Sequence, residues 1–197
     1  MKRHPAPQRF TPHRPAASQE GPWEISIAGE LNDKAGDLVD KLVDVPARSQ
    51  GTIYFDSGGG SAYAGLAMAT IIRLRGLDAV GIVAGECSSA ALLPLAACRR
   101  RLVTPHASLF FHPMRWQSEE DVKLEEAAEW ARHFKILEED LDQLLARMFG
   151  LPVATIISWS RPGRFLTGVE FAEAGLATLV DLFASDLQAQ ISDLHRK

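Results

Sequence analysis

The sequence has few cysteines and no long apolar run, and each of these shortages excludes a class of protein. Its two cysteines, Cys87 and Cys98, are too few for a disulfide framework, and neither has a metal ligand beside it at zinc spacing. We expect both to be reduced thiols in the core. The apolar stretch from Ala90 to Cys98 is far shorter than the roughly eighteen residues that a membrane span needs. We therefore expect a soluble, cytoplasmic protein that uses no metal and no cofactor.

An excess of positive charge is also missing. The 197 residues contain 21 Lys and Arg against 25 Asp and Glu, which gives a net charge of -4. This balance argues against nucleic acid or an anionic membrane as the main partner. A hydrophobic content of 46% in a chain of this length is enough to build one well-packed domain.

Residues 1–22 lack Leu, Ile and Val and contain five prolines. Such a segment cannot bury enough apolar surface to order itself, so it predicts a disordered Pro/Arg-rich arm. The segment lacks the apolar stretch that a secretory signal peptide contains. Because it is rich in arginine, an organelle transit peptide is an alternative interpretation. The domain organisation that we expect is this arm, a single domain over residues 23–184, and a tail over residues 185–197.

From Trp23 onward, short apolar stretches alternate with helical patterns. Strands are predicted at residues 24–28, 52–55 and 79–84, and a helix with a regular apolar face is predicted at about residues 62–75. Strands that alternate with helices of this length indicate an α/β fold with a mainly parallel sheet. In such sheets, ligands gather at the carboxyl ends of the strands.

Three stretches carry candidate chemistry. The glycines Gly58 to Gly60 follow one predicted strand, the segment Gly85 to Ala91 follows the next, and His112 ends an apolar strand. A serine at the start of a buried helix lies beside free backbone N–H groups that favour negative charge, which suits an acyl-transfer nucleophile. Each feature also has an ordinary interpretation: Ser88 and Ser89 would cap the helix, and His112 would be a hydrogen-bonded core residue. The glycine run lacks the Lys-Ser/Thr ending of a phosphate loop.

Taken in order, these motifs resemble the ClpP family, the proteolytic subunits of ATP-dependent Clp proteases, and more broadly the ClpP/crotonase fold. The stretch from Asp56 to Gly65 is similar to the family's Asn-Ser-Pro-Gly-Gly turn and helix, and Gly85 to Ala91 is similar to its Gly-x-Ala-Ala-Ser nucleophile turn. Phe111-His112-Pro113 and Arg164 to Leu176 match two further motifs. The resemblance covers residues 24–182.

The resemblance implies a β-α-β superhelix and assigns roles to particular residues. Ser89 would be the nucleophile and His112 its general base. The backbone N–H groups of Gly60 and Ala90 would form the oxyanion hole, and Gly58 and Gly59 would bind the substrate backbone. The acidic, apolar-striped segment 119–150 is similar to the family's handle helix, although periodicity alone is equally consistent with an ordinary surface helix.

The chain also departs from the family. The triad aspartate would fall at Gly163, and no carboxylate stands within two residues of it. If Gly163 has a positive φ, aspartate is one of the less costly replacements, so we expect Gly163→Asp to raise activity. The Tyr-Ser-Arg-Leu-Leu segment before the first strand is not found either, which puts docking of a Clp ATPase in doubt.

The sequence therefore predicts a ClpP-like serine endopeptidase that forms a homo-oligomeric ring and cleaves peptides or unfolded protein. Two alternatives stay open. One is a weak or inactive Clp-like subunit with an assembly or regulatory role, and the other is a crotonase-type acyl-CoA enzyme. The histidine in the Phe-His-Pro context favours a peptidase over a crotonase.

Overall fold

The computed structural model describes residues 22–32, 35–116 and 121–186. The predicted arm, apart from residue 22, and most of the predicted tail lie outside these described residues. In chain order the elements are β1 (Trp23–Leu31), α1 (Ala35–Asp44), β2 (Gln50–Gly60), α2 (Ala62–Leu74), β3 (Asp78–Ser88), the short 3-10 helix η1 (Ser89–Ala91), α3 (Leu92–Ala97), β4 (Arg100–Val103), β5 (Ser108–Phe111), α4 (Leu124–Phe149), α5 (Val153–Ser160), β6 (Arg164–Thr167), α6 (Gly168–Glu173) and β7 (Thr178–Leu179).

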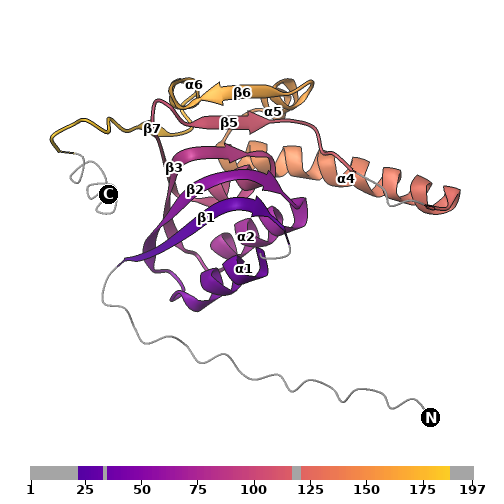
Figure 1. The fold of residues 1–197 in the computed structure, drawn as a ribbon, viewed down its shortest axis with the longest axis horizontal. Coiled ribbons are helices and arrows are strands. Elements are labelled where there is room, and N and C mark those ends of the chain that lie inside the picture. Colours follow the sequence, from indigo (N-terminus) through magenta and orange to yellow (C-terminus); the bar gives the residue numbers. More distant parts are fainter. Residues whose placement is uncertain (1–21, 33–34, 117–120, 187–197) are drawn as a thin grey trace, which may run out of the picture.

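The strands form one mainly parallel sheet, as the alternation of strands and helices predicts. The order β1-β2-β3-β4-β7 is parallel throughout, and the antiparallel pair of the sheet is β5 with β6. The long strand β3 pairs with β4 through its first half and with β5 through its second half. In Figure 1 the sheet rises from β1 to β6, with α1 and α2 beside its lower part and α4 extending away from it. Because β2, β3 and β5 are parallel, their carboxyl ends lie at the same edge of the sheet.

Strands β2 and β3 are longer than the sequence predicts. The glycines Gly58 to Gly60 belong to the end of β2 rather than to a turn, and Ser61 alone caps the following helix by accepting a hydrogen bond from the N–H of Ala64. Glycine explains the difference. A Cβ at Gly60 would lie 2.5 Å from the carbonyl oxygen of Leu31 in the neighbouring strand. The missing side chains therefore let the two strands continue side by side to the site.

A small cluster around Leu102 is separate from the main core, which extends from the sheet to the helices packed against it. The main core contains Phe55, Phe111 and Phe171, which are all fully buried. Both cysteines are buried and free, and burial raises the pKa of the Cys98 thiol to about 12. This agrees with their predicted place in the core. The predicted capping box of Thr167 and Glu170 is present at the start of α6.

Helix α4 is the longest element, and only its second half is part of the core. Leu145, Ala146 and Phe149 are buried, whereas Leu124 near its start is exposed. The helix begins at Leu124 and not at residue 119, because Asp121 has a positive φ of 68° and Lys123 is extended. Figure 1 shows its first half reaching beyond the body of the protein. Its length does not make it a membrane span, since none of the described helices is apolar enough to cross a bilayer.

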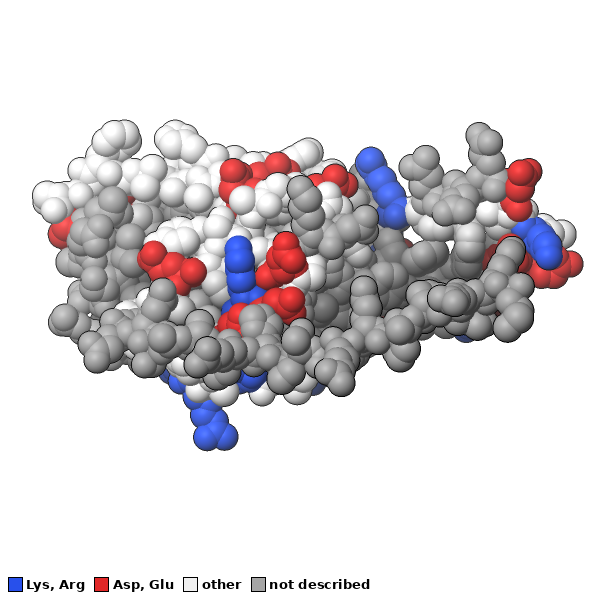
Figure 2. All heavy atoms as spheres, turned by 60° about the horizontal axis from the view of Figure 1, so that its bottom comes forward, with Lys and Arg blue, Asp and Glu red and all other residues white. Residues whose placement is uncertain are grey.

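Charged side chains are mixed on the face that Figure 2 presents. Acidic and basic residues of the described ranges lie beside one another there (Figure 2). The described part of this face therefore offers no continuous basic surface.

Candidate functional site

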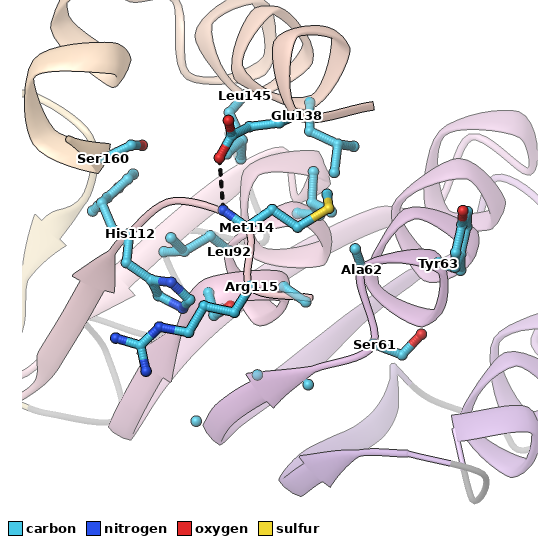
Figure 3. A pocket seen from close by; sticks show the side chains of 18 of the residues that line it. Ser61, Ala62, Tyr63, Leu92, His112, Met114, Arg115, Glu138, Leu145 and Ser160 are labelled. Atoms are coloured by element: carbon cyan, nitrogen blue, oxygen red, sulfur yellow. Dashed lines mark hydrogen bonds between the residues drawn. The ribbon is translucent and has the colours of Figure 1, made fainter. Parts of the chain in front are cut away.

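A cavity of about 910 Å³ lies where β2, β3 and β5 end. Its wall includes the glycines Gly58 to Gly60, Ser89, Ala90 and His112, so all six predicted site residues line the same space. Helix α4 forms the opposite wall through residues such as Glu138 and Leu145 (Figure 3). The fold thus brings together motifs that are more than fifty residues apart in the sequence.

Ser89 has the backbone of a strained turn residue. Its φ is +55°, in the left-handed region that few residues other than glycine occupy, and it begins the 3-10 helix η1 directly after β3. Such strain concentrates at functional positions. Its neighbour Ser88 is 2% exposed, its hydroxyl has no hydrogen-bond partner, and it makes no side-chain cap. Of the two serines, only Ser89 lines the cavity.

The glycines at the end of β2 approach the Ser89 turn closely. A Cβ at Gly59 would lie 2.6 Å from the Cβ of Ser89 and 3.0 Å from the backbone nitrogen of Ala90. Gly59 and Gly60 also have positive φ values, 93° and 136°. Only glycine fits this approach, which places the two backbone segments of the predicted oxyanion hole side by side.

The His112 imidazole is held by a backbone carbonyl and by an aromatic ring. Its Nδ1 lies 2.6 Å from the carbonyl oxygen of Pro113, and its ring stacks on Phe110 with centroids 4.9 Å apart. A carbonyl oxygen only accepts hydrogen bonds, so Nδ1 is the nitrogen that carries the proton. In the neutral form of the ring, the other nitrogen, Nε2, is then the proton acceptor that a general base requires.

Gly163 lies beside His112, where the family resemblance places the triad acid. A Cβ at Gly163 would lie 3.6 Å from the Cβ of His112 and 3.4 Å from the ring of Phe110. Its φ is +131°, which is positive as anticipated but far from the left-handed well near 57° that aspartate tolerates. The expectation that aspartate fits here at little cost is therefore wrong.

A charged cluster that was not predicted from the sequence lies on the α4 wall. Arg161 lies 2.9 Å from Oε2 of Glu138 and 3.1 Å from Oδ2 of Asp142, and Oε1 of Glu138 accepts a 2.7 Å hydrogen bond from the backbone N–H of Met114. Burial raises the pKa of Asp142, although Arg161 opposes this effect, and the hydrogen bond to Glu138 raises the pKa of Arg161. One signal was available: Glu138 interrupts the apolar stripe between Phe134 and Leu141.

Comparison with known proteins finds similarity over most of the chain. The sequence profile of the Clp protease family matches residues 23–181. An ATP-dependent Clp protease proteolytic subunit of Pleurastrum terricola is 28% identical over 164 residues, which are 79% of this chain and 82% of that protein. A subunit with the same description from Ligilactobacillus salivarius is 27% identical over 159 residues, which are 77% of this chain and 79% of that protein.

Proposed function

Because the chain belongs to the Clp protease family, we propose that it is a serine peptidase that hydrolyses peptide bonds in polypeptides. The observation that carries the proposal is the contrast between the two serines. Ser89 faces the cavity that it shares with His112, whereas Ser88 is buried away from it.

The proposed reaction follows acyl transfer in two steps. Oγ of Ser89 attacks the peptide carbonyl while Nε2 of His112 takes the hydroxyl proton. The N–H groups of Gly60 and Ala90 donate hydrogen bonds to the oxyanion, and Gly58 and Gly59 bind the substrate backbone. The imidazolium then gives its proton to the leaving amine. In the second step His112 activates a water molecule that hydrolyses the ester on Ser89.

Covalent labelling tests this proposal. A serine-directed phosphonofluoridate should modify the full-length protein once, and mass spectrometry of proteolytic fragments should place the adduct on Ser89. Ser89→Ala should abolish the adduct, and Ser88→Ala is the matched control that should retain it. Labelling that survives Ser89→Ala but is lost in Ser88→Ala would overturn the assignment.

A second candidate is a Clp-like subunit of low activity that serves assembly or regulation. The observation in its favour is Gly163, since a chain without a carboxylate at this position lacks the usual partner of the histidine. Loss of such an acid lowers kcat by roughly 10⁴ in a Ser-His-Asp enzyme. Turnover of a short peptide by the wild-type protein distinguishes the two candidates. A crotonase-type activity would require acyl-CoA turnover that Ser89→Ala does not affect.

We also propose that the protein acts as a homo-oligomeric ring on peptides or unfolded polypeptide. The support is the family membership together with the exposed first half of α4, whose apolar residues Leu124 and Ile136 contact solvent in the single chain. A Clp ATPase is a doubtful partner, because the family's segment before the first strand is not found in residues 1–22.

A further inference from the structure

The peptide group between Pro113 and Met114 is hydrogen-bonded on both sides. Its carbonyl oxygen lies 2.6 Å from Nδ1 of His112, and its N–H donates to Oε1 of Glu138 at 2.7 Å. Figure 3 shows the second bond, which reaches from α4 across the top of the cavity to the segment that follows His112. One planar peptide unit therefore connects a carboxylate to the imidazole ring.

Glu138 is better placed for this contact than the other acidic groups of the cavity. The described lining residues include three carboxylates: Glu30, Glu138 and Asp142. Asp142 pairs with Arg161, while Glu138 uses Oε2 for the same arginine and Oε1 for Met114. Because Arg161 is shared between two carboxylates, it does not cancel the charge on both of them.

An aromatic stack borders the space beside His112 where a direct acid would act. The ring of Phe110 stacks on the imidazole and also lies within 3.4 Å of where a side chain at Gly163 would begin. Phe110 stacks in turn on Phe165, with ring centroids 3.9 Å apart. Phe110 therefore packs on the face of the imidazole ring. The Nδ1 edge of the ring contacts the Pro113 carbonyl instead.

We propose that Glu138 is a positioning residue for His112 and acts through the Pro113–Met114 peptide group in place of the missing triad aspartate. The carboxylate polarises the N–H of Met114, which makes the Pro113 carbonyl a stronger acceptor, since hydrogen bonds in a chain strengthen one another. The stronger acceptor keeps the proton on Nδ1 and favours the imidazolium that forms during catalysis. No proton crosses the peptide group.

The catalytic part of this inference rests on the proposed function, so the test has two independent readouts. The first is the kcat and KM of peptide hydrolysis, with the rate of phosphonofluoridate labelling at Ser89. Glu138→Ala should lower kcat about tenfold and leave KM unchanged, the effect of losing one hydrogen bond to a charged group. Glu138→Gln keeps an acceptor without the charge and should give a smaller loss.

The second readout is the tautomer of His112, which does not depend on activity. Magic-angle-spinning ¹⁵N NMR of histidine-labelled full-length protein distinguishes protonated from bare ring nitrogens, and His112→Gln identifies the signals. The wild type should show the proton on Nδ1, and Glu138→Ala should shift the population toward Nε2. Glu139→Gln, at an exposed neighbouring position on α4, is the matched control and should change neither readout.

Each outcome has one meaning. If the wild type is not labelled at Ser89, the proposed function fails, and the NMR comparison still decides whether Glu138 orients His112. If Ser89 is labelled but Glu138→Ala changes neither the tautomer nor kcat, the inference is overturned while the peptidase assignment stands. A rise in KM with kcat unchanged, or an equal effect of Glu139→Gln, would also overturn it. Glu138→Gln is close in shape to the native residue, so it gives a folded comparison if the alanine variant unfolds.

Discussion

Gly163 and His112 are close neighbours: a Cβ on the glycine would lie 3.6 Å from the Cβ of the histidine. The position where the family has its triad acid is therefore adjacent in space to His112, the proposed general base. What prevents an acid from acting there is the backbone, whose φ of +131° is a conformation that L side chains rarely adopt.

Adding a side chain at Gly163 should destabilise the protein. We expect Gly163→Ala and Gly163→Asp each to lower the free energy of unfolding by about 1–3 kcal/mol, the usual cost of a residue held in a disfavoured region. Neither should raise peptidase activity. Urea unfolding measures the change, and Gly36→Ala is the control, because a Cβ at Gly36 meets no atom within 4 Å. An aspartate variant as stable as the wild type and faster in turnover would contradict this expectation.

Ser57 and Ser88 should respond in opposite ways to truncation. Oγ of Ser57 donates to the carbonyl of Gly29 at 2.5 Å and accepts from the N–H of Gly59 at 3.2 Å, whereas Oγ of Ser88 is buried with no partner. Ser57→Ala should therefore cost about 1–3 kcal/mol by leaving the buried N–H of Gly59 without its acceptor, and Ser88→Ala should be neutral or stabilising. Thermal unfolding of the two variants checks this, and equal losses would contradict it.

The buried carboxyl of Asp142 should make stability depend on pH. Burial raises its pKa above the ordinary 3.8, so the folded state binds this proton more tightly than the unfolded state. Its contribution to stability is then fully present below pH 3.8 and is lost as pH rises through the higher folded value. The stability of Asp142→Asn relative to wild type should accordingly increase as pH rises from about 4 to 7. Asp140→Asn, at an exposed site on the same helix, should show a constant difference.

The first half of α4 should take part in self-association. Leu124 is 82% exposed and Ile136 is 45% exposed, which is a large apolar surface for a helix that leaves the body of the protein. Light scattering should show assemblies well above 21.6 kDa, and Leu124→Glu with Ile136→Glu should shift them to smaller species. Lys135→Glu is the control at an exposed position beside Ile136. A wild-type protein that stays at the mass of one chain would count against this prediction.

Much of the fold was predictable because its signals are local in sequence. The alternation of apolar strands and amphipathic helices predicts the parallel sheet, and Thr167 with Glu170 predicts a helix start that the structure contains. The placement of Ser89 and His112 at one cavity also follows, because parallel strands expose their carboxyl ends on one edge of a sheet.

Features of the site that depend on contacts between residues far apart in the sequence were decided by the tertiary structure. Glu138 bonds to a backbone group 24 positions earlier, and Asp142 pairs with Arg161 across a helix junction. No spacing rule predicts such contacts, since they depend on how α4 packs over the sheet. The φ of Gly163 and the burial of Ser88 beside the accessible Ser89 are likewise set by the surrounding chain. The sequence by itself determined which residues could react. The packing of α4 and β5 determined which groups contact His112 and the peptide group that follows Pro113.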